Sequence, residues 1–124
     1  MIDVTRRNKL LGLPNNSESI DCQSFYGLSV DVLEQLLAEG FIDLDENQNN
    51  SPTTEEFLEF MKKYPGVKAH GYVIGCDRED CRTTLEGLSF MGEVTFPMLV
   101  DFTEMCRFAD EFVIGEDGLY SWWD

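Results

Sequence analysis

Three side chains near the middle of the chain are of types that can do nucleophilic or metal chemistry: His70, Cys76 and Cys81. A thiolate beside an imidazole can attack an acyl group, and both groups can ligate zinc. The two cysteines flank residues 77–80, so a cross-strand disulfide is a further option. The sequence offers no oxyanion loop and no second pair of zinc ligands nearby, so we expect structural, reduced thiols.

A second set of candidate ligands lies in the polar segment 43–56. Alternate positions carry oxygen side chains: Asp43, Asp45, Asn47 and Asn49. This spacing resembles the calcium-binding loop of the EF-hand family. Three shaping positions differ. Gln48 stands where that loop needs glycine, Asn50 where it needs an apolar residue, and Thr54 where it needs a bidentate glutamate. We therefore expect a solvated linker between helices that does not bind calcium, and no metal or other cofactor.

Charge is the most informative property of the chain. The 124 residues carry a net charge of −15, and no lysine or arginine occurs from Leu10 to Met61. Such a field repels nucleic acid and anionic membranes and attracts a basic protein surface. The acids least suited to a core or a helix cap are the expected partner-binding residues: Glu34, Glu39, Asp43, Asp45, Glu46, Glu55 and Glu59.

The C-terminal tryptophans are the remaining candidates for partner contact. Trp122 and Trp123 are adjacent, so on a strand their side chains point to opposite faces. One can enter the core while the other faces outward. An exposed aromatic residue among acids is typical of an interface anchor, but coverage by the N-terminal arm is the favoured alternative.

The N-terminus has no apolar run of signal-peptide length, and no stretch approaches a membrane span. We therefore expect a cytoplasmic protein. In that compartment cysteines remain reduced, which favours free thiols over a disulfide framework. The four cysteines are Cys22, Cys76, Cys81 and Cys106.

The elements that would position these residues follow from periodicity and capping signals. Residues 1–24 are rich in turn-forming residues, so we expect an irregular arm with a short helical turn near 5–11. Ser29 is a good N-cap for a helix that ends at Gly40. Thr53 with Glu56 forms a capping-box pattern for a second helix, which Pro65 stops.

Period-two patterning follows from Val67 to Met91 and predicts a β-hairpin with a bulge at 86–87. A third helix opens at 95–97 and is the most apolar, so we expect it to be central. A second hairpin, 112–115 with 119–123, closes the chain through the turn at Asp117.

Together these signals predict an α+β protein of two layers. The expected order is α-α-β-β-α-β-β, with three principal helices on a four-stranded antiparallel sheet, in a single domain at 25–124. The leading functional hypothesis is a non-enzymatic acidic interaction protein, of the immunity or nucleic-acid-mimic type, and a homodimer is compatible with it. The alternative is a small enzyme or ligand-binding protein with a pocket near His70, Tyr72 and the hairpin cysteines. A metal-binding protein built on 43–56 is third.

Overall fold

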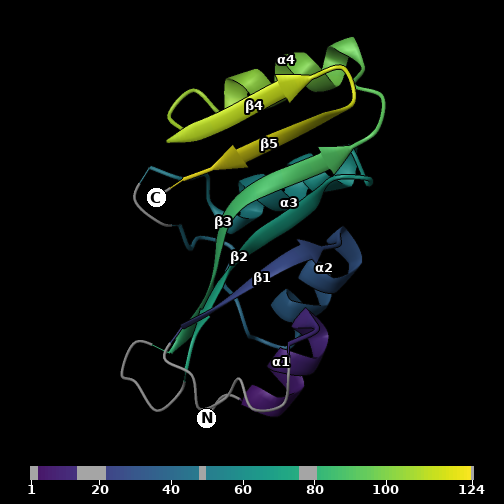
Figure 1. The fold of residues 1–124 in the computed structure, drawn as a ribbon. Helices are drawn as coiled ribbons and strands as arrows, with labels where there is room; N and C mark the ends of the chain where they lie inside the picture. The colour runs from purple at the N-terminus through teal and green to yellow at the C-terminus, as the bar shows by residue number, and fades with distance from the viewer. Residues whose placement is uncertain (1–2, 14–21, 48–49, 76–80, 124) are drawn as a thin grey trace.

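The computed structural model describes residues 3–13, 22–47, 50–75 and 81–123. Its helices pack on an antiparallel five-stranded sheet of order β1-β2-β3-β5-β4 (Figure 1). The elements in chain order are α1 (Val4–Leu11), β1 (Cys22–Leu28), α2 (Val30–Ala38), α3 (Thr54–Lys63), β2 (Lys68–Ile74), β3 (Arg82–Met91), α4 (Phe96–Met105), β4 (Glu111–Gly115) and β5 (Gly118–Trp122).

The α+β class is confirmed, but the described residues form four helices and five strands instead of three and four. Both additions lie in or next to the segment expected to be an irregular arm. The short helical turn near 5–11 is the full helix α1, and β1 begins at Cys22. β1 pairs antiparallel with β2 from Cys22 opposite Ile74 to Leu28 opposite Ala69. Its pairing partner lies some 40 residues further on, which no local pattern could reveal.

The predicted helix starts are confirmed by their caps. The Ser29 hydroxyl accepts a hydrogen bond from the Val32 amide at 3.3 Å. At α3 the capping box is complete, since the Glu56 amide donates to Thr53 Oγ1 at 3.2 Å and the Thr53 amide donates to Glu56 Oε1 at 3.1 Å. These bonds satisfy backbone donors that a helix N-terminus leaves unpaired.

The predicted bulge in the first hairpin is also confirmed. His70 lies opposite Gly87 and Gly71 lies opposite Leu85, so Glu86 is the extra residue on β3. Gly87 is needed beside it, because a Cβ there would lie 1.9 Å from the Ser121 carbonyl oxygen. The bulge keeps Leu88 on the buried side of the sheet, where it is fully buried.

The core lies between the helices and one face of the sheet (Figure 1). α3 is the central helix, with five buried residues against two in α4. The expectation that the third helix would be central is therefore wrong. α4 lies at the β4 end of the sheet and covers only part of it, which leaves Phe96 and Val100 exposed (Figure 1). Core members from each layer include Phe25, Leu33, Leu36, Phe57, Met61, Leu88, Phe102 and Trp123.

None of the described helices has the length and apolar character needed to cross a membrane.

Candidate functional site

Three of the seven acids expected to bind a partner surround one surface hollow of about 490 Å³. Glu34 comes from α2, and Asp43 and Asp45 come from the segment that follows it. Between these carboxylates the lining is entirely apolar. We call this site the α2 hollow, and it is lined by Glu34, Leu37, Ile42, Asp43, Leu44, Asp45 and Leu58.

The chain reversal after α2 creates this arrangement. Gly40 adopts a left-handed backbone, with φ of +79°, which ends the helix and turns the chain back. Ile42 is then buried, while Leu44 remains 45% exposed at the surface of the hollow. The Glu55 amide at the start of α3 donates to the Leu44 carbonyl at 2.9 Å and so fixes the segment against α3.

Glu46 lies at the end of the same segment but is only partly exposed. Its backbone carbonyl accepts from the Thr54 amide at 2.9 Å, which gives the residue a structural role. Burial raises the pKa of its carboxyl group, and a hydrogen bond from the Asp43 backbone opposes part of that effect. Because its side chain is partly buried, Glu46 is less accessible to a partner than the exposed acids are.

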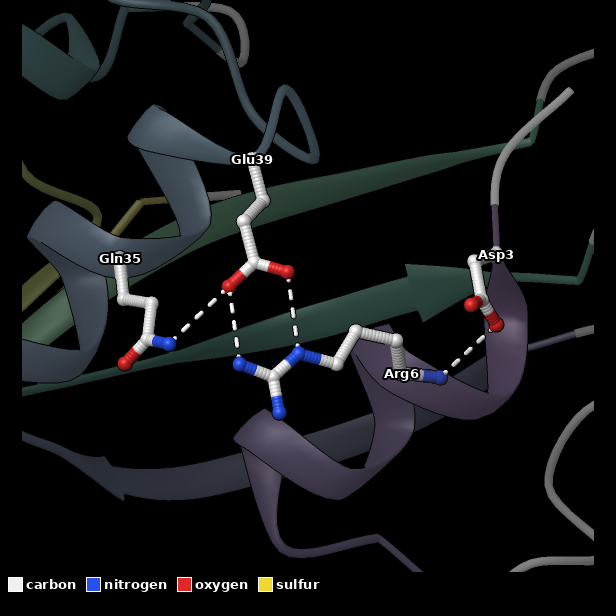
Figure 2. A network of polar contacts seen from close by, with 4 residues as sticks. All are labelled: Asp3, Arg6, Gln35 and Glu39. Atoms are coloured by element: carbon white, nitrogen blue, oxygen red, sulfur yellow. Dashed lines mark hydrogen bonds and ion pairs between the residues drawn. The ribbon is translucent and has the colours of Figure 1, made fainter.

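Glu39 has a partner within the chain. Its two carboxylate oxygens accept from Arg6 Nε and Nη2, each at 3.0 Å, and Gln35 also donates to it (Figure 2). Arg6 lies on α1, whose N-terminus is capped by Asp3. The hydrogen bond from Arg6 lowers the pKa of Glu39. This pair joins α1 to α2 and partly neutralises Glu39.

Glu55 and Glu59 are exposed on α3, and neither is among the residues that line the α2 hollow. Glu59 instead lines a second hollow of about 530 Å³, which we call the α3–α4 hollow. Acidic and basic side chains both line it: Glu56, Glu59, Lys63, Asp101, Glu104 and Arg107. The seven acids thus do not line one hollow, and of these two hollows in the described part of the chain the α2 hollow is the one lined by acids without bases.

The cations of the α3–α4 hollow are already engaged. Lys63 Nζ donates to Asp101 Oδ2 at 2.7 Å, and the Tyr64 hydroxyl donates to the same oxygen at 2.6 Å. The hydrogen bond from Lys63, followed by that from Tyr64, lowers the pKa of Asp101. Arg107, which follows α4, pairs with Glu104 in the last turn of that helix. Two of its four carboxylates, those of Asp101 and Glu104, are thus paired within the chain, and its two bases oppose the approach of a basic partner.

The two tryptophans divide between core and surface. Trp123 is 1% exposed and meets the Phe57 ring edge to face at 5.5 Å, so it is a core residue that no partner can reach. Trp122 is partly exposed, and its Nε1 donates to Glu86 Oε2 at 3.2 Å. Of the two tryptophans, Trp122 is therefore the one that a partner can contact.

The alternative site near His70 is closed. His70 is 6% exposed and stacks between Tyr120, at 5.2 Å between ring centroids, and Tyr26, at 6.3 Å. Burial lowers its pKa, so the neutral form is favoured. Tyr72 is engaged through its hydroxyl, which accepts from Arg82 Nη2 at 3.1 Å. Neither of the two hollows described above includes His70 or Tyr72 in its lining.

The cysteines differ from expectation in one respect. Cys81 is disulfide-bonded, so the prediction of four reduced thiols is wrong there; that prediction rested on the compartment and not on sulfur geometry. Cys22 is free and exposed, and Cys106 is free and buried, with burial raising its pKa to about 11. Cys76 lies outside the described residues.

The described part of the chain contains no group of three His, Cys, Asp or Glu side chains placed to hold a metal ion. Residues 48 and 49 of the segment that resembles an EF-hand loop lie outside that part. The segment is braced by its own hydrogen bonds, including one from Asn47 Nδ2 to the Ser51 carbonyl at 3.3 Å.

No protein-family model, curated protein or solved structure matches this chain. The functional interpretation therefore rests on the geometry of its surfaces.

Sequence reasoning missed a concentration of exposed apolar side chains. Nine large apolar residues are exposed in the described part of the chain, and seven of them lie between Met91 and Ile114. In the sequence these residues read as strand and helix core positions, because nothing local shows that α4 leaves them uncovered. They are Met91, Phe96, Val100, Phe108, Phe112, Val113 and Ile114.

Proposed function

We propose that this protein is a non-enzymatic binding module whose α2 hollow takes a lysine or arginine side chain from a basic partner protein. One observation carries the proposal: three carboxylates surround an apolar floor, and no basic residue lines the same hollow among the described residues. Long cationic side chains match such a site, because their methylene stems pack on apolar surface while the charged end meets carboxylates.

The charge of the chain supports the same function. A net charge of −15 strengthens the attraction of a basic surface toward the molecule and raises the rate of encounter. The hollow then provides the specific contact that a diffuse field lacks. Leu44, exposed between Asp43 and Asp45, is the residue on which the partner's aliphatic stem packs in this proposal.

An enzyme centred on His70 has less support. The imidazole is held between two tyrosine rings and is almost fully buried, so a substrate could reach it only after the sheet face rearranged. General acid-base catalysis needs a side chain within hydrogen-bond reach of the substrate.

A charge-matched pair of variants tests the proposal. The first variant combines Glu34→Lys, Asp43→Lys and Asp45→Lys, and the control combines Glu59→Lys, Glu93→Lys and Glu104→Lys. All six residues are exposed, so both variants should fold with stabilities close to the wild type. Each protein, immobilised at low salt, is exposed to extract from the native host, and the retained proteins are identified.

The proposal predicts a basic protein that the wild type and the control retain and that the hollow variant loses. Since exposed charges are strongly screened at high ionic strength, raising the salt should also release it. Equal loss from both triple variants would show that net charge alone is responsible. Retention of every captured protein by the hollow variant would contradict the proposal outright.

A further inference from the structure

The edge strand β4 differs from the rest of the sheet. It pairs with β5 on one side, and no strand in the described part of the chain pairs with its other side. All five of its residues are exposed, which leaves the backbone groups of its outer edge accessible. Unpaired strand edges are templates for pairing with another chain.

Natural edge strands usually carry protective features, and β4 has few of them. Lysine, proline or a bulge commonly blocks an edge. The strand instead reads Glu-Phe-Val-Ile-Gly, and its pairing with β5 runs in regular register from Glu111 opposite Trp122 to Gly115 opposite Gly118. Phe112 is 46% exposed and Val113 is 54% exposed. Because neighbouring residues on a strand point to opposite faces, both sides of β4 present apolar surface.

Acidic residues flank the strand at both ends. Asp110 and Glu111 begin it, and Glu116 and Asp117 follow it, all four of them exposed. These charges determine which strand can pair with the edge.

A second copy of this chain is disfavoured by those charges. Antiparallel pairing of β4 with itself, centred on Val113, would set Asp110 of each copy opposite Glu116 of the other. Like charges directly across two strands are destabilising, and here the pair would occur twice. The net charge of −15 on each molecule adds to the repulsion.

We propose that the free edge of β4 binds an extended segment of a partner protein, with apolar residues at its centre and lysine or arginine residues on both sides. The segment adds a sixth strand to the sheet, and backbone hydrogen bonds along β4 supply the part of the affinity that does not depend on the partner's sequence. Its apolar side chains cover those of Phe112, Val113 and Ile114. Its basic ends face the acids on either side of the strand.

This surface is separate from the α2 hollow. α2 lies beside β1, and β1 and β4 are the opposite edges of the sheet (Figure 1). The proposal for β4 therefore does not depend on the proposed function of the hollow, and each can fail alone.

A labelled nonapeptide, Lys-Lys-Thr-Val-Ile-Val-Thr-Lys-Lys, is a direct probe. Paired antiparallel with its isoleucine opposite Val113, it sets lysines opposite Asp110 and Glu116. Binding is measured by fluorescence anisotropy, and amide hydrogen exchange locates the contact. One control peptide carries proline in place of isoleucine, because proline cannot complete the backbone ladder. A second control peptide carries glutamate in place of every lysine.

The protein variants are matched in charge. Asp110→Lys with Glu116→Lys changes the strand flanks, and Glu34→Lys with Asp43→Lys makes the same change in the α2 hollow. We expect the flank variant to bind the basic peptide about tenfold more weakly, since opposite-charge pairs across strands contribute up to about 1 kcal/mol each. A lysine of the peptide can also enter the α2 hollow of the wild type, so the β4 contact is measured in the hollow variant, with and without the flank changes. The hollow variant should still bind the basic peptide, and its exchange protection should be confined to residues 111–115.

Three results would overturn the proposal. The first is equal binding of the proline peptide and the basic peptide. The second is the absence of exchange protection at β4 when the hollow variant is mixed with the basic peptide. The third is a dimer of the free protein, seen by sedimentation and lost on Val113→Lys, which would assign the edge to a second copy.

Discussion

At the scale of single residues, a few side chains fix the geometry of the α2 hollow. Gly40 turns the chain after α2, and the amides at the start of α3 hold the acidic segment in place through the carbonyls of Leu44 and Glu46. Thr53 caps the same helix end. The carboxylates of the hollow are therefore positioned by backbone contacts, and reversing their charge leaves the support intact.

The Thr53 cap should be measurable in stability. Thr53→Ala removes the hydroxyl that accepts from the Glu56 amide, and loss of such a cap costs about 1 kcal/mol. Thr103→Ala is the matched control. The Thr103 hydroxyl donates to the Leu99 carbonyl within α4, where that carbonyl is also an acceptor for the helix backbone, and alanine is the better helix former. Urea unfolding at pH 7 measures both. Equal stability losses in the two variants would contradict the role of the cap.

His70 should make stability depend on pH. Burial lowers its pKa in the folded protein below that of the unfolded chain, about 6.5. Its contribution is therefore complete above that pH and is lost as the pH falls toward the folded-state pKa, because the unfolded chain then binds the proton more readily. His70→Phe keeps an aromatic ring between Tyr26 and Tyr120 but cannot titrate.

The comparison is the change in urea midpoint between pH 7.5 and 5.5, on the order of one unit either side of the unfolded-state pKa of histidine. The acidic groups affect both proteins equally, so the difference between the two changes in urea midpoint isolates the contribution of His70. We expect the wild type to lose more stability than His70→Phe over this interval. Equal changes in urea midpoint in the two proteins would mean that the folded-state pKa of His70 is not lowered.

At the scale of elements, local signals in the sequence predicted most of the fold. The caps at Ser29 and Thr53, the bulge at Glu86 and both hairpins were predicted from residue types and spacing, and the structure has each of them. β1 was not predicted, because its residues alternate poorly and it is a strand only through pairing with β2. The predicted central position of α4 was also wrong, since an apolar helix need not be the central one.

β1 gives a test at this scale, because adjacent aromatic residues on it face opposite ways. Phe25 is 2% exposed in the core, and Tyr26 is 77% exposed. Phe25→Ala should reduce the free energy of unfolding by about 3 to 5 kcal/mol through the cavity it leaves. Tyr26→Ala should cost about 1 kcal/mol or less, mostly through its stacking on His70. Similar losses in the two variants would show that β1 does not pack as described.

At the scale of the whole molecule, the sequence predicts a basic partner, and that prediction stays untested, but composition does not show how the acids are grouped on the surface. Composition gives the net charge of −15, yet it cannot show that Glu39 pairs with Arg6 while Glu34, Asp43 and Asp45 gather around one hollow. Those groupings arise from how α2, α3 and the intervening segment pack. The exposed edge of β4 also depends on tertiary structure, because it follows from the order of the strands in the sheet.

The central claim is that the α2 hollow receives a cationic side chain, and NMR titration tests it most directly. The probe is a hexapeptide amide of glycine and arginine, Gly-Arg-Gly-Gly-Arg-Gly, which lacks an apolar centre for the β4 edge. We predict that changes in amide chemical shift concentrate at residues 34–45, vanish in the Glu34→Lys, Asp43→Lys, Asp45→Lys variant, and weaken strongly at about 0.5 M salt. Changes spread evenly over the exposed acids of α3, α4 and β4 would contradict the account, since they would show a diffuse field with no binding site.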